Sequence, residues 1–419
     1  MSGVVSSLTR RGRLFALLGI ALLITGPGLG MTDLTRIGAL LLLLPLLTLL
    51  LVRRHPLGFE VTRRLVPSQV QIDQPATVEL TVANPSRVRS PVLVAEESID
   101  LVLGDLPRWV IPPLRRGSSH TVAYEVSSPV RGRHGLGPLS LGVSDPFGLT
   151  DRLVTLRSSA EILVLPRVVW LGSGGAGARG VGSDGTIPHM VALHGEDDIA
   201  VRDYRDGDDL RRVHWPATAR TGALMVRQED RPAMRRAVVI LDSRASVHGP
   251  TVSPSLEWAV TMAASIVAHC ERLGYAVHLV TASPRAGIGR ETNRLSTSLE
   301  ALALVTPGPD EDLAGVLHTA GPVVSAGGLV IAIVGTCTDE TAGAIASLRA
   351  PGGTGSAVIV DRTTMSAATE SVRPGAGPLA TAEVLRSAGW DATLVGPATA
   401  WAQAWGAMTA RPSGVGVRS

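Results

Sequence analysis

Two apolar runs near the start of the chain constrain its fold more than any other feature. Leu14–Leu29 carries no charge, and Ile37–Val52 follows after a short segment that contains Asp33 and Arg36. Each run approaches the roughly 17–25 residues that an α-helix needs to cross a bilayer. A signal peptide would end in a small-residue cleavage site and would not be followed at once by a second apolar run. We therefore expect a transmembrane helical hairpin over residues 14–52.

Arginines flank this hairpin on both sides, and they predict its orientation. Positive residues accumulate on the cytoplasmic side of membrane helices. Residues 1–13 and the chain after the hairpin should therefore lie in the cytoplasm, which makes the protein a multi-pass protein of the cell membrane with its bulk inside. The two cysteines, Cys270 and Cys337, are expected as buried free thiols, as suits that compartment. The flanking arginines are Arg10, Arg11, Arg13, Arg53, Arg54, Arg63 and Arg64.

Residues 57–171 have the pattern of short β-strands. Thr77–Val82 and Thr121–Val126 alternate polar and apolar side chains, as half-buried strands do. Turn signals separate such segments, and about seven strands with this spacing predict an antiparallel β-sandwich, immunoglobulin-like in outline. The segments Pro129–Pro138 and Asp145–Leu149 are interpreted as hairpin and turn geometry rather than ligand loops.

A glycine-rich stretch and then a highly charged one follow the β-rich region. Residues 172–198 begin with GSGGAGARGVGSDG, and we interpret them as a linker or loop. All 39 basic side chains of the protein are arginines, so a P-loop with its lysine is excluded. Residues 199–230 gather acids, arginines, a tyrosine and a tryptophan. Within them we expect a short helix over Leu210–Trp215, capped by Asp208 or Asp209 and ended by Pro216.

Three interpretations of this charged segment compete. Its aspartates, with nearby histidines, could bind a divalent metal for hydrolysis. It could instead be a rigid bracket between domains, in which Asp208 pairs with Arg211 or Arg220. It could also be a docking surface, because tryptophan, tyrosine and arginine are frequent interface anchors. Arginines alternate with the acids, which favours the second and third interpretations; the acids are Asp203, Asp206, Asp208 and Asp209.

Residues 236–410 alternate strand and helix patterns. The apolar run Ala237–Leu241 ends in Asp242, and the helical stretch Leu256–Leu273 follows it. Further strands and helices repeat this order, which predicts a parallel sheet with helices on both faces. Ligands of such sheets bind at the carboxyl ends of strands. Residues 411–419 are expected to be a disordered tail.

Asp242 opens a sequence that is similar to a known metal motif. Von Willebrand factor A domains have Asp-x-Ser-x-Ser after their first strand, and its oxygens hold a divalent cation such as Mg²⁺. Here Asp242 and Ser246 match, but Arg244 replaces the first serine. A guanidinium cannot ligate a cation and repels it. We therefore expect the fold to be kept without the ion, so that Asp242 and Ser246 form a degenerate site and no cofactor binds.

The charged segment resembles the hallmark of a bacterial family known as domain of unknown function 58. That hallmark reads Arg-x-Tyr-x-x-Gly-Asp-Asp-x-Arg-x-Ile-x-Trp-x-x-Ser/Thr-Ala-Arg, and Val213 for isoleucine is the one soft departure. The resemblance implies a membrane-associated protein, a von Willebrand A-like domain, and a partnership with a MoxR-type AAA+ ATPase and a transglutaminase-like membrane protein. The residues that carry it are Arg202, Tyr204, Gly207, Asp208, Asp209, Arg211, Trp215, Thr218, Ala219 and Arg220.

These features together predict a membrane-anchored, non-enzymatic scaffold or adaptor that acts in protein maturation or complex assembly. The alternatives are a metal-dependent hydrolase that uses the acidic segment, and a metal-dependent adhesion module at Asp242. Nucleic acid is not an expected partner, because the net charge is only +3 and aromatic residues make up 3% of the chain.

Overall fold

The computed structural model divides the chain into two compact units, Met1–Leu165 and Pro166–Ser419. The structure describes residues 8–54, 58–145, 147–172, 201–204, 213–227, 235–282, 294–325, 328–349, 353–361, 377–396 and 399–409. The predicted tail over residues 411–419 and almost all of the predicted linker over residues 172–198 lie outside these ranges.

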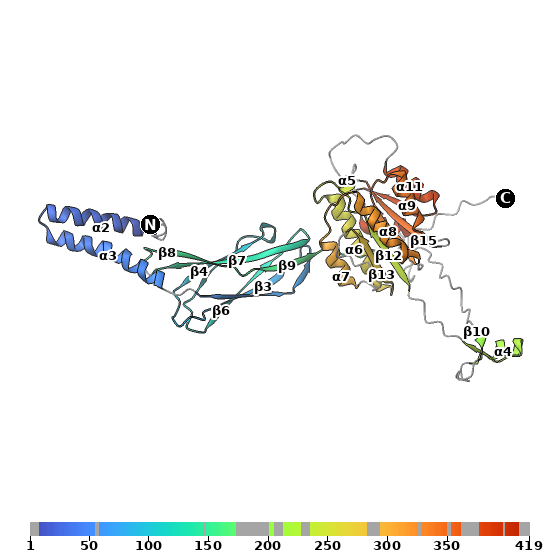
Figure 1. Cartoon of the computed structure of the whole chain (residues 1–419), viewed down its shortest axis with the longest axis horizontal. Helices are drawn as coiled ribbons and strands as arrows, with labels where there is room; N and C mark the ends of the chain where they lie inside the picture. The colour runs from blue at the N-terminus through green and yellow to red at the C-terminus, as the bar shows by residue number, and fades with distance from the viewer. Residues whose placement is uncertain are drawn as a thin grey trace. The chain divides into compact units, whose positions relative to one another are not determined.

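The described part of the first unit includes two helices near its start, α2 (Arg10–Gly28) and α3 (Thr32–Arg54), drawn in blue in Figure 1. Glycines let their backbones approach, since a Cβ on Gly19 would lie 2.9 Å from the carbonyl oxygen of Gly38. Within the described residues, one helix is long and apolar enough to cross a membrane, and it is α3 through Thr32–Leu50. The prediction of two transmembrane helices is thus supported for α3 alone. In α2, arginines occupy the first turn and shorten the apolar length of the helix.

The described residues that follow form nine strands in two sheets. One sheet has the order β1-β3-β6, and the other has the order β2-β9-β7-β4-β5 with β8 also paired to β7. Among the described strands, pairing is antiparallel except between β2 and β9, which run parallel and so depart from a purely antiparallel region. The strands are β1 (Glu60–Val66), β2 (Gln69–Gln71), β3 (Ala76–Ala83), β4 (Leu93–Ile99), β5 (Arg108–Ile111), β6 (Ser119–Val126), β7 (Gly132–Ser144), β8 (Asp151–Leu156) and β9 (Ala160–Leu165).

The two sheets of this β-rich region enclose one core. Strand β3 buries every second residue, as its alternating sequence predicts. Its buried Leu80 and Val82 pack with Leu93 of β4 and Leu141 of β7, which belong to the other sheet. A 3₁₀ turn, η1 (Leu101–Leu103), follows β4. The polar–apolar alternation of the sequence is thus the pattern that holds the sheets face to face.

The described residues of the second unit form a five-stranded parallel sheet with the order β13-β12-β14-β15-β16. All residues of β14 are buried, which is expected of a strand covered on both faces. Helices α8, α9 and α11 pack against the sheet in one apolar cluster. The strands are β12 (Arg236–Leu241), β13 (Ala276–Thr281), β14 (Leu329–Val334), β15 (Thr354–Val360) and β16 (Asp391–Val395).

The described helices that surround this sheet follow the strands in alternation, as the sequence predicts. They are α5 (Ala245–His248), α6 (Pro254–Arg272), α7 (Leu295–Ala303), α8 (Glu311–Ser325), α9 (Asp339–Ser347), α11 (Pro378–Ser387) and α12 (Trp401–Thr409). The chain reverses its direction of progress through the sheet between β12 and β14, which are neighbours. In open α/β sheets this switch point is where ligands bind, outside the carboxyl ends of the strands.

Candidate functional site

The switch point holds a buried ion pair rather than an open crevice. Asp242 follows the last residue of β12, and its side chain is fully buried. The Arg244 guanidinium donates from Nε to one carboxylate oxygen of Asp242 at 2.9 Å and from Nη2 to the other at 2.8 Å. Such two-pronged pairs combine charge with fixed geometry. The Asp242 carboxylate is thereby neutralised from within the chain.

The end of β14 completes the surroundings of this pair. The Gly335 amide donates to Asp242 at 3.2 Å, and Arg244 also donates to the carbonyl of Thr336 at 3.2 Å. Burial alone lowers the pKa of Arg244, but the hydrogen bonds and the charge of Asp242 outweigh it and raise that pKa. Arg244 therefore stays charged and ties β12 to β14.

Cys337 lies at the same place, and Arg244 Nη2 donates to its sulfur at 3.3 Å. Burial raises the pKa of the Cys337 thiol to about 11, although the Arg244 charge acts in the opposite direction. Both cysteines are free and buried, as predicted. A thiol held protonated in this way is a packing group and a weak hydrogen-bond partner rather than a nucleophile.

Ser246, the second residue of the predicted degenerate metal motif, faces a different partner. Its hydroxyl donates to the carboxylate of Asp310. The loop before α8 is fixed beside it, because the Ala245 amide donates to the carbonyl of Gly308 at 2.7 Å. Within the described residues, no group of three or more histidine, cysteine and acidic side chains is arranged to hold a metal. Asp242 and Ser246 thus each have a protein partner of their own.

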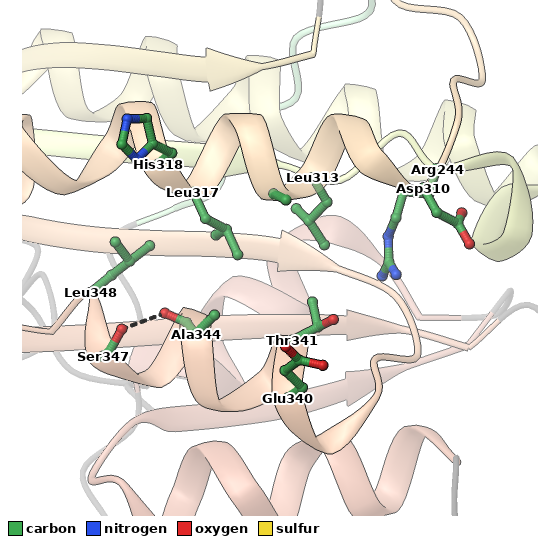
Figure 2. A pocket seen from close by; sticks show the side chains of 11 residues that line it. Arg244, Asp310, Leu313, Leu317, His318, Glu340, Thr341, Ala344, Ser347 and Leu348 are labelled. Atoms are coloured by element: carbon green, nitrogen blue, oxygen red, sulfur yellow. Dashed lines mark hydrogen bonds between the residues drawn. The ribbon is translucent and has the colours of Figure 1, made fainter.

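A pocket of about 380 Å³ opens next to this pair, between α8 and α9. Figure 2 shows Leu313 and Leu317 pointing from α8 toward α9, with Arg244 at one end of the pocket. Two exposed carboxylates, Asp310 and Glu340, stand at its mouth. The remaining lining residues are Ala314, His318, Thr341, Ala344, Ser347 and Leu348.

The lining of the pocket carries a net negative charge once the Arg244–Asp242 pair is counted as neutral. Arg244 is balanced by Asp242, so Asp310 and Glu340 carry the net charge of the lining. More carboxylates lie in the first turns of the two helices, Glu311 and Asp312 on α8 and Asp339 on α9. Acids at helix N-termini are favoured there by the helix dipole. The pocket therefore combines an apolar floor with an acidic rim.

The charged segment of the sequence forms a small hairpin with a short helix. Strands β10 (Val201–Asp203) and β11 (Met225–Arg227) pair antiparallel, and α4 (Trp215–Thr221) lies between them in sequence. The predicted helix over Leu210–Trp215 is wrong at Val213, which bridges to Val226, and at His214, which caps α4, while Leu210–Arg212 lie outside the described residues. Pro216 occupies the first turn, where the missing amide costs nothing, and the His214 side chain accepts from the Ala217 amide at 3.2 Å.

The predicted signature residues of this segment differ in their hydrogen bonds and in their exposure. The Tyr204 amide donates to the carbonyl of Leu224 at 2.8 Å, and the Thr218 hydroxyl accepts from the Met225 amide at 3.0 Å. Trp215 is 69% exposed, and Ala219 and Arg220 are also exposed. Arg202 is described only as a residue of β10. Gly207, Asp208, Asp209 and Arg211 lie outside the described residues, and the predicted pairing of Asp208 with an arginine lies there too.

Asp310 and Glu340 were not singled out from the sequence. A signal for them exists, since both lie at the starts of helices in the crossovers between strands of a parallel sheet, α9 directly after β14 and α8 after α7. The partner of Asp242 was also missed. Arg244 was interpreted only as a residue that repels a metal, whereas it supplies the positive charge itself.

Comparison with known proteins gives a family for part of the chain. A family model described as Protein of unknown function DUF58 matches residues 200–365, which include the signature segment and most of the parallel sheet. The comparison with curated proteins gave no match.

Solved structures resemble about a quarter of the chain. The CARDB domain of the PF1109 protein from Pyrococcus furiosus, in complex with di-metal ions, is 17% identical, with 26% of this chain and 90% of that chain covered and a TM-score of 0.19. The putative ApaA protein from Bordetella pertussis is 15% identical, with 26% and 92% covered and a TM-score of 0.20. A cohesin module of a Clostridium perfringens family 33 glycoside hydrolase is 12% identical, with 25% and 96% covered and a TM-score of 0.20.

Proposed function

The chain belongs, through residues 200–365, to the family described as Protein of unknown function DUF58, and from this premise we propose that it is a membrane-anchored, non-enzymatic scaffold or adaptor. Its proposed partners are a MoxR-type AAA+ ATPase and a transglutaminase-like membrane protein, in the maturation or assembly of other proteins. These partners come from the family resemblance.

The proposed architecture has three parts. Helices α2 and α3 cross the cell membrane as a hairpin, the β-rich region is an immunoglobulin-like sandwich, and the parallel-sheet unit is a von Willebrand A-like domain on the cytoplasmic side. The apolar segment Thr32–Leu50 supports the anchor. The two β-sheets around one core support the sandwich. The buried Asp at the end of β12 supports the comparison with von Willebrand A domains.

One observation carries the adaptor function, and it is the pocket between α8 and α9. Its apolar floor and acidic rim suit a partner segment that carries a long apolar side chain flanked by basic residues. The crevice that an α/β enzyme would use for its ligand is filled by Arg244 and Asp242. The pocket between α8 and α9 remains open at this edge of the sheet, and a protein segment is the proposed occupant.

Filling the pocket tests this proposal. Ala344 lies on α9, lines the pocket and is exposed, so Ala344→Trp adds bulk without disturbing the core. We expect this variant to stay folded in detergent and to lose co-purification with the ATPase. Ala402→Trp on α12 is the matched control, because Ala402 is also an exposed helical alanine but lies outside the pocket lining. Equal recovery of the ATPase with both variants contradicts docking in this pocket.

The variant Arg244→Ser, compared with the native protein, tests the metal-dependent alternatives. This change restores the serine of the Asp-x-Ser-x-Ser motif and leaves Asp242 without its counter-charge. We expect the variant to melt at a lower temperature than the native protein and to regain stability with Mg²⁺ or Mn²⁺, while the native protein does not respond. A response of the native protein to either ion would revive the metal-dependent alternatives.

A further inference from the structure

Asp145 and Phe147–Thr150 form the turn between β7 and β8, called here the anchor turn, which is built around the buried carboxylate of Asp145. Asp145 accepts hydrogen bonds from the amides of Phe147 at 2.6 Å and Leu149 at 2.8 Å, and from the Thr150 amide and hydroxyl. The Gly148 amide closes the turn on the Asp145 carbonyl at 3.1 Å. A carboxylate satisfied by so many donors fixes the backbone around it. Phe147 therefore points outward from a preformed loop.

The anchor turn is fastened to the first turn of α2. The Thr9 hydroxyl donates to the carbonyl of Gly148 at 2.7 Å, and the Thr9 amide donates to the carbonyl of Leu149 at 3.0 Å. Gly12 lies against the same segment, since a Cβ there would come within 2.1 Å of the Leu149 carbonyl oxygen. The start of α2 and the anchor turn are therefore in direct contact.

The position of the anchor turn along the membrane normal follows from the helices. Helix α2 packs along α3 through Gly19 and Gly38, and α3 contains the segment that is apolar enough to span a bilayer. The 19 residues of α2 rise by about 28 Å, close to the roughly 30 Å of a hydrocarbon core. If α3 spans the membrane, as proposed above, the start of α2 lies at the level of the lipid headgroups.

The side chains exposed at this level suit a lipid surface. Phe147 is 60% exposed, and Arg10 and Arg11 at the start of α2 are exposed beside the anchor turn. Arginines attract anionic headgroups, and aromatic side chains bury well at the boundary between headgroups and acyl chains. Most of the Phe147 surface is thus open in the described part of its unit. Continuity with a membrane helix favours lipid over a protein as its partner.

We propose that the anchor turn is a second membrane contact, in which Phe147 inserts at the headgroup boundary of an anionic leaflet beside Arg10 and Arg11. It fixes the β-rich region against the membrane, so that the region does not swing freely on α3. This inference rests on the proposed membrane anchoring.

The test uses the full chain in vesicles of phosphatidylcholine and phosphatidylglycerol, with an environment-sensitive fluorophore on a single introduced cysteine. The native Cys270 and Cys337 are buried, so the label goes to the new position. The variants are Phe147→Cys, Leu101→Cys and Leu43→Cys. Leu101 is 85% exposed and follows β4 at the opposite end of the sheet, and Leu43 is 59% exposed within the apolar segment of α3.

We expect the emission of the Phe147→Cys label to shift to the blue and to be lost when lipids brominated near the headgroup are added. The Leu101→Cys label should stay in water, and the Leu43→Cys label should be quenched by deeply brominated lipids. A Phe147→Cys label that behaves like the Leu101→Cys label, while Leu43→Cys is quenched, overturns the inference alone. A Leu43→Cys label that stays in water overturns the membrane anchoring itself.

A separate experiment tests whether the contact requires anionic lipid. In vesicles of pure phosphatidylcholine we expect weaker quenching of the Phe147→Cys label than in vesicles that contain phosphatidylglycerol. Arg10→Gln with Arg11→Gln should remove this difference. Equal quenching in both kinds of vesicle overturns the role of the arginines.

Discussion

Arg244 and Asp242 are the residues whose roles are most tightly coupled in this protein. Both are buried, and each oxygen of Asp242 has a donor on Arg244. Removing one member of a buried pair leaves a charge without compensation, which costs about 3–5 kcal/mol. Replacing both members with apolar residues of similar volume is often close to neutral. Removing one member of the pair should therefore cost much more stability than replacing both.

We predict that Arg244→Ala lowers the free energy of unfolding by about 3–5 kcal/mol and that the double variant Asp242→Leu with Arg244→Met recovers most of this loss. Thermal melting of the full chain in detergent measures both. Arg133→Ala is the control, since Arg133 pairs with Glu161 at 3.2 Å on the surface and should cost at most about 1 kcal/mol. A loss for Arg244→Ala no larger than that of the control would contradict the role of the pair.

His269 is expected to make the stability of the protein depend on pH. Burial, together with the charge of Arg272, lowers the pKa of His269 below its ordinary value near 6.5. Arg272 donates to Nδ1 of His269 at 2.8 Å, and the ring packs edge-on against Trp405, so the folded protein favours the neutral ring. The unfolded chain binds the proton more readily, so stability is present above about pH 6.5 and is lost as pH falls below it.

Accordingly, the melting temperature should fall between pH 7.5 and pH 5.5. His269→Gln should reduce this slope but not remove it, because burial and Arg236 also lower the pKa of His278. Melting curves of both proteins at the two pH values decide the question. An unchanged slope in His269→Gln means that His269 is not responsible.

At the residue scale, the sequence predicted where a residue lies on its strand or helix better than it predicted which other residues it contacts. Asp242 was expected at the carboxyl end of a strand, and it lies there because the apolar run before it can only be a buried strand. Its pairing with Arg244 and with the Gly335 amide depends on where β14 lies, which no local pattern contains. Asp310 was missed for the same reason, since its contact with Ser246 of α5 joins residues 64 positions apart in the sequence.

At the element scale, α4 shows how one residue can be misread. Proline ends a helix when it lies inside one, but it begins a helix well at the first position. Only the His214 cap and the left-handed Gly222 at the other end distinguish the two cases here. Longer elements such as α6 were located within two residues, because many apolar positions at helical spacing define them together. The parallel pairing of β2 with β9 was not predictable, because the two short strands lie far apart in the sequence.

Trp215 provides the test of α4 as a docking element. With 69% of its surface exposed at the start of α4, its side chain contributes little to folding. We predict that Trp215→Ala changes the free energy of unfolding by no more than about 0.5 kcal/mol but weakens co-purification with the ATPase. Leu379→Ala is the control, because Leu379 is similarly exposed, at 64%, on α11. A folded Trp215→Ala protein that keeps its partner leaves the segment with a purely structural role.

For the whole molecule, and on the proposal that α3 crosses a membrane, the contact between α2 and the anchor turn predicts how many crossings the chain makes. Thr9 is hydrogen-bonded to Gly148 and Leu149, so the start of α2 and the β-rich region lie on the same side of any bilayer. A single crossing by α3 would place residues before and after it on opposite sides. Both conditions hold together only if α2 crosses as well, although its arginines shorten its apolar length.

We therefore predict that reporters fused at the N-terminus and at the C-terminus are both active in the cytoplasm, as the flanking arginines also require. A reporter inserted after Gly30, between α2 and α3, should be active only outside the cytoplasm. The same three fusions in a Gly19→Leu and Gly38→Leu background provide a further check. Bulky side chains at these close backbone contacts should separate the helices and lower the amount of inserted protein. Activity of the two terminal reporters on opposite sides would mean that α3 crosses alone and that the contact of Thr9 with the anchor turn does not form in the membrane.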